Sequence, residues 1–385
     1  MKKIGIATVH TGFNYGSALQ AYASKMILNE LGYQGINISL KGSFIKGRDV
    51  RIKKIAVIAF RLLRQPHNIK KRVSIYSDNM SKPYSEHSKE LFKTFRLNKI
   101  QPNHCTWNQL KRLAKSDDFK AFLCGSDQIW NAEALYVDPQ YYLRFAPKEK
   151  RIAFAPSFGR DKVADYNKNI ITKYIMDIPN LSVREESGVS IIKELTNKNA
   201  AHLIDPTLLL DGTKWDKYLE LQEDLSESEK YILAYFLNEP SDFAKKCIKE
   251  LADRTKLKVI ALPYQREASD WFDCAPDAGP VEFVQYVKNA SYVCTDSFHG
   301  TAFAVNYEVP FYTFERQYGS AGKQSSRLDS FLKLVSLEER FNPSMELLVA
   351  PIDFSKSKDV LEEERKKSVE YLINALQYMG EKNGR

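Results

Sequence analysis

Residues 291–305 read SYVCTDSFHGTAFAV, and this stretch decides how the chain is expected to fold. Residues 291–295 are apolar, β-branched and aromatic, as in a short buried strand, whereas residues 300–305 are small and apolar, as in a helix. Asp296 and Ser297 between them are turn and helix-capping residues. The stretch therefore predicts a strand that runs into a helix N-terminus, where free backbone N–H groups favour an anion.

His299 is the main candidate for proton transfer in this stretch. An imidazole has an ordinary pKa that lets it give or take a proton near neutral pH. Asp296 can orient the ring, Ser297 can donate to an anion, and Gly300 leaves room beside it. A histidine that only caps its helix is the structural alternative, but the combination of neighbours favours a functional role.

Strands and helices alternate on both sides of this stretch. The predicted strands cover residues 231–237, 257–262, 292–295 and 311–314, and the predicted helices cover residues 242–255, 281–289 and 300–306. Strands that alternate with helices form parallel sheets with right-handed crossovers. We therefore expect a doubly wound, Rossmann-like α/β domain over residues 215–355.

The first half of the chain shows the same alternation. Its predicted strands cover residues 3–9, 36–40, 120–124, 152–155, 181–183 and 201–204. We expect a first α/β domain over residues 1–214, with the acidic and polar residues 215–230 as the connection between domains. An amphipathic helix within residues 356–385 is free to reach back to the first domain.

The loop at residues 10–16, HTGFNYG, joins the first strand to a predicted helix at residues 17–32. Nucleotide-binding α/β units begin in this way, but the fingerprint G-x-G-x-x-G is absent, because only Gly12 and Gly16 are present. A nicotinamide cofactor is therefore not expected. Asn14 and Ser17 offer polar atoms to a ligand at the helix start, although a plain tight turn is an equal alternative.

Polar side chains follow three other strands of the first half. Asp127 and Gln128 follow residues 120–124, Ser157 follows residues 152–155, and Arg184 follows residues 181–183. Ligands of open α/β sheets bind at the carboxyl ends of the strands. Arg184 can bind a carboxylate or phosphate through two N–H groups, or it can pair with one of the glutamates that follow it.

A cationic loop follows the strand at residues 311–314. Arg316, Lys323 and Arg327 are separated by glycine and serine in the sequence QYGSAGKQSSR. We expect this loop to close over an anion. A solvated surface loop is the alternative, above all for Lys323.

Composition excludes several classes of protein. The 385 residues are 43% apolar, carry a net charge of +9 and include five scattered cysteines without metal-site spacing. No zinc-finger spacing or RNA-binding aromatic motif is present, so a nucleic-acid partner and a bound metal are not expected. The apolar run near the start is too short for a signal peptide, and reduced thiols fit a cytoplasmic protein.

Residues 41–72 have a different character from the rest of the first half. They contain eleven Lys or Arg against one acidic residue, together with an apolar insert at residues 55–60. A basic segment with apolar residues can lie on an anionic membrane surface. The alternative is an excursion packed on its own domain with a solvated basic face.

Six motifs together resemble the polysaccharide pyruvyl transferase family. In chain order they are GFNYGSALQAYA (12–23), CGSDQIWN (124–131), FAPSFG (154–159), SVREESG (182–188), IDPTLLL (204–210) and TDSFHGTAFA (295–304). The resemblance implies two Rossmann-like domains that face a cleft, as in glycosyltransferases of type B, and no metal. It also implies phosphoenolpyruvate as donor and a sugar of a cell-surface polysaccharide, such as a capsule or exopolysaccharide, or its lipid-linked precursor, as acceptor.

The resemblance also implies roles for individual residues. His299 and Arg184 match family positions at the donor, and one of Arg316, Lys323 and Arg327 matches a further basic position. From the residue chemistry we add Ser297 and Gly300 at the donor and Asp296 or Asp127 as partner of His299. The acceptor-binding candidates are Asn14, Gly16, Ser17, Gln128 and Ser157.

Two other functions fit the same sequence features. A glycosyltransferase that uses a nucleotide sugar would bind the diphosphate at the helix start near Gly300. A non-catalytic binding protein on the same scaffold is the second, although the presence of His299, Asp296 and Arg184 together argues against it. The acceptor sugar and the oligomeric state stay open.

Overall fold

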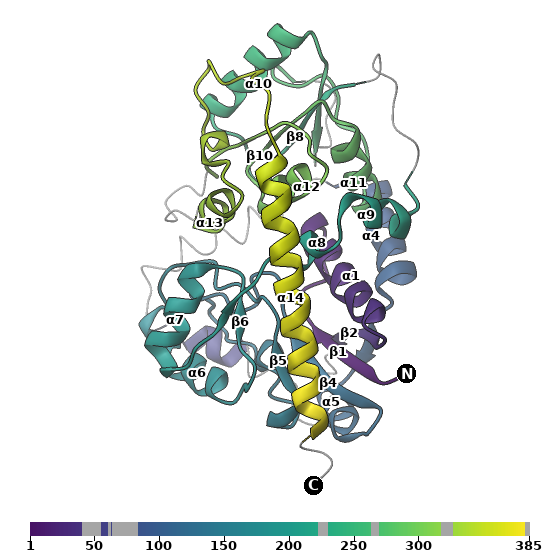
Figure 1. Cartoon of the computed structure of the whole chain (residues 1–385), viewed down its shortest axis with the longest axis vertical. Coiled ribbons are helices and arrows are strands. Elements are labelled where there is room, and N and C mark those ends of the chain that lie inside the picture. Colours follow the sequence, from purple (N-terminus) through teal and green to yellow (C-terminus); the bar gives the residue numbers. More distant parts are fainter. Residues whose placement is uncertain are drawn as a thin grey trace.

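The computed structural model describes residues 1–40, 55–60, 63, 84–221, 230–262, 269–316 and 326–381 (Figure 1). The predicted basic excursion at residues 41–72 therefore lies outside the described residues, except for residues 55–60 and Leu63. Lys323 and most of the predicted cationic loop also lie outside them.

The first half contains a five-stranded parallel sheet in the order β3-β2-β1-β4-β5. Its strands are β1 (Lys3–Ala7), β2 (Gln34–Leu40), β3 (Asn103–Cys105), β4 (Phe119–Cys124) and β5 (Arg151–Ala153). Edge strand β3 is not predicted from the sequence, because its three residues, NHC, carry no apolar alternation. The two-stranded parallel sheet of β6 (Ser182–Val183) and β7 (Ala201–His202) follows β5.

Helices connect these strands. They are α1 (Tyr15–Glu30), α4 (Glu86–Phe95), the π-helical turn η1 (Arg96–Ile100), α5 (Trp107–Lys115), α6 (Asp165–Met176), α7 (Glu186–Thr196), α8 (Pro206–Leu209) and α9 (Gly212–Leu219). Short 3-10 turns lie at Pro139–Tyr142 and Lys148–Lys150. Helix α9 contains the expected boundary at residues 214 and 215, and the division into domains stays a prediction.

The second half contains a four-stranded parallel sheet in the order β11-β10-β8-β9. The strands are β8 (Ile232–Tyr235), β9 (Val259–Leu262), β10 (Tyr292–Thr295) and β11 (Phe311–Thr313). The helices are α10 (Asp242–Thr255), α11 (Pro280–Asn289), α12 (Phe298–Asn306) and α13 (Ser326–Leu334), with a 3-10 turn at Glu338–Arg340. Helix α12 begins two residues before its predicted start, because Ser297 caps it.

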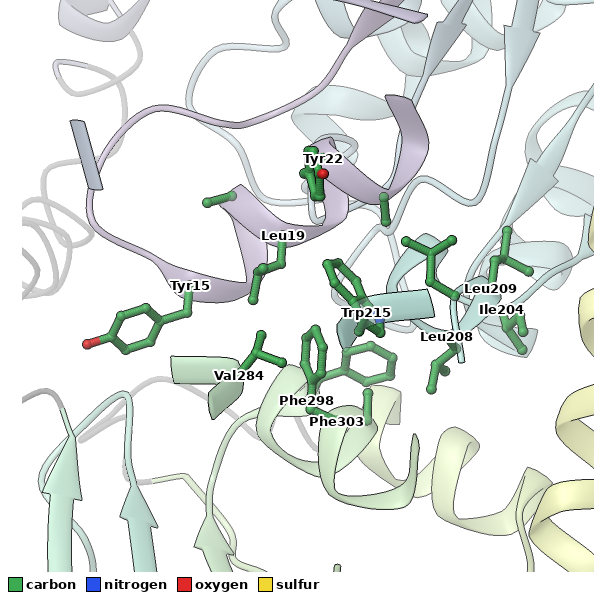
Figure 2. Close-up of a cluster of buried hydrophobic side chains, with 14 of the residues drawn as sticks. Tyr15, Leu19, Tyr22, Ile204, Leu208, Leu209, Trp215, Val284, Phe298 and Phe303 are labelled. Atoms are coloured by element: carbon green, nitrogen blue, oxygen red, sulfur yellow. The ribbon is translucent and has the colours of Figure 1, made fainter. Parts of the chain in front are cut away.

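The two halves share one hydrophobic core (Figure 2). Tyr15 at the start of α1 stacks on Phe283 of α11, with ring centroids 4.7 Å apart, and on Phe92 of α4 at 5.1 Å. Trp215 of α9 packs on Phe303 of α12 at 5.1 Å. These aromatic contacts hold α1 directly against the helices of the second half, and so they bring the carboxyl ends of both sheets together.

The C-terminal helix α14 (Ser355–Glu381) crosses from the second half to the first (Figure 1). Arg365 donates from Nε to the carbonyl oxygen of Leu208 at 2.8 Å and from Nη2 to Asn306 Oδ1 at 2.7 Å. Farther along, the Tyr371 hydroxyl donates to the carbonyl oxygen of Ala153 in β5 at 2.9 Å. The predicted fold class is therefore confirmed: two parallel, Rossmann-like sheets and a C-terminal helix that returns to the first half.

No helix in the described ranges is both long and apolar enough to span a membrane. The described residues also contain no group of three or more His, Cys, Asp or Glu side chains that could hold a metal ion. All five cysteines are free thiols, and Cys274 is the exposed one.

Candidate active site

His299 lies in the first turn of α12, between the two halves, and is 7% exposed. One side of its ring lies directly against Gly16 of α1. A Cβ atom built on Gly16 would lie 2.0 Å from Nδ1 of the imidazole and 2.2 Å from its Cγ. The first half of the chain therefore forms one wall of the site in which the histidine of the second half lies.

Asp205 is the carboxylate beside His299. It follows β7, caps α8 by accepting from the backbone N–H of Thr207 at 3.0 Å, and is fully buried. Its Oδ2 accepts from Ser126 Oγ at 2.8 Å and from Nη1 of Arg184, and lies 3.8 Å from His299 Nε2. A separation of 3.8 Å is too long for a hydrogen bond, so Nε2 has no hydrogen-bond partner among the described residues.

Arg184 is buried at the end of β6 beside this carboxylate. Its guanidinium carbon lies 4.6 Å from the ring centroid of Phe298, and its Nε and Nη2 have no partner among the described residues. Buried polar groups are normally hydrogen-bonded. The two N–H groups are therefore available to an anionic ligand.

The electrostatics of this pair keep both groups charged. Burial disfavours each charged form, yet Asp205 and Glu185 raise the pKa of Arg184 above its ordinary value. Burial also acts to raise the pKa of Asp205, but Arg184 and His299 hold that pKa well below its usual range. The site thus contains a buried arginine that stays charged, with two buried carboxylates beside it.

A small pocket opens beside Arg184, between the strand ends of the first half and helices α12 and α13. Its walls comprise Arg184, Glu185, His202, Ile204, Asp205, Leu208, Phe298, Arg327, Ser330, Phe331 and Leu334. Arg327 of α13 thus shares the pocket with Arg184. Of the other two basic residues predicted for the donor, Arg316 bonds to Asp296 instead, and Lys323 lies outside the described residues.

Glu185 is a second buried carboxylate of this pocket, at 2% exposure. One oxygen, Oε1, accepts from the Ser157 hydroxyl and from the backbone N–H of Gly159 at 3.3 Å. The other oxygen, Oε2, has no hydrogen-bond partner among the described residues. A carboxylate with one oxygen fixed and one open can accept a proton or a hydroxyl group.

The predicted acceptor residues gather around Asp127. Ser17 donates from Oγ to Asp127 Oδ2 at 2.5 Å, and Asn14 caps α1 by accepting from the N–H of Ser17 at 2.9 Å. The backbone N–H of Gln128 donates to Oδ1 of Asp127 at 2.8 Å, and that of Ser157 donates to its carbonyl oxygen at 2.9 Å. Because Gly16 directly precedes Ser17, this group adjoins the His299 ring.

Asp296 has partners other than the imidazole. Its carboxylate accepts from the N–H of Leu237 at 2.7 Å and from Arg316 Nε at 3.0 Å, and its carbonyl oxygen accepts from Arg316 Nη2 at 2.8 Å. The expected place beside His299 belongs to Asp205 instead. The physical reason is that Asp296 faces the loop after β8 and the end of β11.

Ser297 and Gly300 are hydrogen-bonded to each other at the start of α12. The N–H of Gly300 donates to Ser297 Oγ at 3.4 Å. Packing also requires a glycine at position 300, because a Cβ there would lie 2.5 Å from Thr295 Oγ1 and 3.0 Å from the ring of Tyr235. Both residues therefore shape the turn that carries His299.

A family model for polysaccharide pyruvyl transferase matches residues 14–318, which contain all of these residues except Lys323 and the pocket residues contributed by α13. The chain belongs to the polysaccharide pyruvyl transferase family. No curated protein matches the chain significantly.

Several solved structures resemble this pyruvyl transferase family member along most of their length. The S. aureus MnaA–UDP co-structure has a TM-score of 0.49 at 11% identity and covers 94% of this chain and 88% of that one. A UDP-GlcNAc 2-epimerase of Methanocaldococcus jannaschii has a TM-score of 0.46 at 13% identity, over 98% and 100% of the two chains. The glycosyltransferase SnogD of Streptomyces nogalater has a TM-score of 0.41 at 9% identity, over 99% of each. With TM-scores below 0.5, the fold assignment depends on the parallel sheets themselves.

Two residues of this family member's site are not predicted from its sequence. Asp205 lies in the quoted motif IDPTLLL, where an aspartate before proline reads as an ordinary helix cap. Glu185 follows Arg184 and reads as its possible salt-bridge partner rather than as part of the pocket. An acidic residue within three positions of a strand end was the available signal in both cases.

Proposed function

We propose that the protein transfers the pyruvyl group of phosphoenolpyruvate to a sugar of a cell-surface polysaccharide or of its lipid-linked precursor, with release of phosphate. The observation that carries this proposal is the buried group of Arg184, Asp205 and His299. It leaves two N–H groups of Arg184 and Nε2 of His299 without a partner among the described residues. Such open polar atoms suit a small anionic donor and a proton transfer.

The donor carries both a carboxylate and a phosphate, and so it needs more than one cationic group. Arg184 and Arg327 are the two arginines that line the pocket. We assign the open Nε and Nη2 of Arg184 to one anionic group of the donor and Arg327 to the other. Asp205 accepts from Nη1 of Arg184, which supports this assignment because Nε and Nη2 are left for the ligand.

The reaction requires the transfer of two protons. Two neighbouring hydroxyls of the sugar add in turn to C2 of the donor, and each loses a proton. One proton reaches the methylene carbon, which becomes a methyl group, and the second leaves with the phosphate as the C2–O bond to phosphate breaks. We assign His299 as the acid or base of this sequence, and Glu185, through Oε2, as a second proton acceptor.

We assign the sugar to Asp127 and its neighbours in the first half. Ser17 and the N–H of Gln128 already hold the Asp127 carboxylate. A carboxylate has about four acceptor sites, so two hydrogen bonds leave capacity for hydroxyl groups of a sugar. Gly16 joins this group to His299, which supports a shared acceptor and donor site.

The test supplies phosphoenolpyruvate together with a panel of aryl and lipid-linked glycosides. The expected result is phosphate release and a pyruvyl-sized mass gain on one glycoside. His299→Ala should abolish both while the far-ultraviolet circular dichroism stays unchanged; unaltered phosphate release would refute the catalytic role. Thermal stabilisation by nucleotide sugars but not by phosphoenolpyruvate would favour a glycosyltransferase and overturn the proposal.

A further inference from the structure

We propose that residues 55–60 and Leu63 bind the surface of an anionic lipid bilayer. We call these residues the apolar patch. The patch shares no residue with the candidate active site, and the inference does not depend on the reaction proposed above.

The apolar patch is exposed where most other apolar side chains are buried. Residues 55–60 are helical and read IAVIAF, so every residue of this segment is apolar. Ile55 is 61% exposed, Phe60 is 55% exposed and Leu63 is 82% exposed. The described part of the chain has ten large apolar side chains that are exposed, and three of them lie in this patch. Such a local concentration marks an interaction surface rather than chance exposure.

The sequence around the patch selects an anionic partner. In the sequence, Lys53 and Lys54 directly precede Ile55, Arg61 lies between Phe60 and Leu63, and Arg64 directly follows Leu63. Residues 41–72 contain eleven basic residues and one acidic residue. Apolar side chains flanked by basic ones match a bilayer with anionic headgroups, where the apolar groups enter the interface and the charges meet the lipid phosphates.

The full-length protein is tested by sedimentation with vesicles of phosphatidylcholine alone and of phosphatidylcholine mixed with phosphatidylglycerol. We expect binding to the anionic vesicles at about 0.1 M salt and release at about 1 M salt, where the screening length falls from about 10 Å to about 3 Å. Absence of binding to the anionic vesicles would overturn the proposal. Equal binding to both kinds of vesicle would show that the basic residues do not contribute to binding, and it would overturn the choice of an anionic bilayer.

Two triple variants test whether vesicle binding depends on the apolar patch or on exposed apolar side chains in general. Ile55→Ser, Phe60→Ser and Leu63→Ser together should weaken vesicle binding at least about tenfold, because three apolar groups can no longer enter the interface. The matched control is Leu97→Ser, Met176→Ser and Phe243→Ser, whose side chains are 58%, 47% and 41% exposed at other places on the surface. The control should bind as the unaltered protein does. Equal loss in both triple variants would contradict the proposal.

Two further measurements make the outcome unambiguous. If light scattering shows that the patch variant turns a dimer into a monomer while lipid binding was never present, the patch is a contact between copies of this chain and the lipid proposal fails. Transfer of the pyruvyl group to a soluble aryl glycoside should be unchanged in the patch variant. If the unaltered protein binds vesicles but neither it nor any variant catalyses this transfer, the proposed function is contradicted and the lipid proposal is not.

Discussion

The imidazole of His299 lies against the backbone of Gly16, so that a Cβ atom at Gly16 would lie 2.0 Å from Nδ1. Real Cβ atoms do not approach other heavy atoms this closely, so any side chain at this position must displace the ring. Gly16 belongs to α1 of the first half and His299 to α12 of the second. The position of the proposed acid or base is therefore set by contact between the halves.

Gly16→Ala tests this contact. Alanine is the better helix former by about 1 kcal/mol, so α1 itself should not suffer. The ring must move, however, and a misplacement of about 1 Å can lower kcat by about 100-fold. We expect a large loss of kcat, together with a fall in unfolding free energy of about 1 to 3 kcal/mol that is typical of an overpacked buried contact. The matched control is Gly188→Ala in α7, where the Cβ would meet Val183 at 3.2 Å and lies away from the imidazole; an equal loss of kcat in this control would contradict the explanation.

Asp205→Asn removes a buried charge but keeps the helix cap, since asparagine caps a helix about as well as aspartate. Arg184 would then lose its salt-bridge partner in a fully buried site, and breaking such a pair typically costs about 3 to 5 kcal/mol of unfolding free energy. Urea denaturation measures this loss. The control is Asp211→Asn, which also caps a helix by accepting from the N–H of Lys214 at 2.8 Å. There the expected loss is only a few tenths of a kcal/mol. Similar values for both variants would show that the Arg184 pair does not stabilise the fold.

Local sequence patterns were sufficient for most of the fold. Strand β10 and helix α10 begin and end at the predicted residues, because each has a clear apolar pattern and turn or cap residues on both sides. Edge strand β3 has neither an apolar pattern nor a turn signal of its own. It forms because Asn103 to Cys105 pair with β2, which is a tertiary effect.

The candidate site was predictable only in part, for the same reason. His299, Arg184 and Asp127 could be predicted as site residues because each follows a recognisable strand. The residues that contact His299 could not be predicted, since Asp205 is 94 positions away in sequence and Gly16 lies in the other half. A single sequence does not show which strand ends meet across two sheets.

Arg184→Lys should act on substrate binding more than on turnover. A lysine can replace the charge toward Asp205, but it cannot also present the two remaining N–H groups or lie flat over the Phe298 ring. We expect KM for phosphoenolpyruvate to rise by about tenfold or more, as expected for the loss of one charge-assisted hydrogen bond. Steady-state kinetics with varied phosphoenolpyruvate give this value. A fall in kcat at constant KM would place Arg184 in the chemical step instead.

Glu185→Gln removes the proposed proton acceptor but keeps the hydrogen bonds that hold this side chain in place. Glutamine retains one oxygen to accept from Ser157 and Gly159, but it replaces the open Oε2 by a group that cannot take a proton. We expect kcat to fall by about 100-fold, within the usual range for loss of a general base. Glu186→Gln is the control, because Glu186 is exposed at the next position. Loss of activity in both variants, or full activity in Glu185→Gln, would reject the assignment.

The burial of His10 should make the stability of the fold depend on pH. Its Nδ1 lies 3.1 Å from the carbonyl oxygen of Thr8, which can only accept, so Nδ1 carries the proton and Nε2 is a bare, buried acceptor. Burial lowers the pKa of His10 from 6.5 to about 4. Between these two pH values the unfolded chain binds a proton that the folded chain does not, and stability therefore falls as the pH falls. The full difference corresponds to about 3 kcal/mol. Urea denaturation between pH 7 and pH 4 should show a slope that is reduced in His10→Gln and retained in His87→Gln, whose side chain is exposed. An identical slope in both variants would mean that His10 is protonated in the folded protein or that other groups dominate the acid dependence.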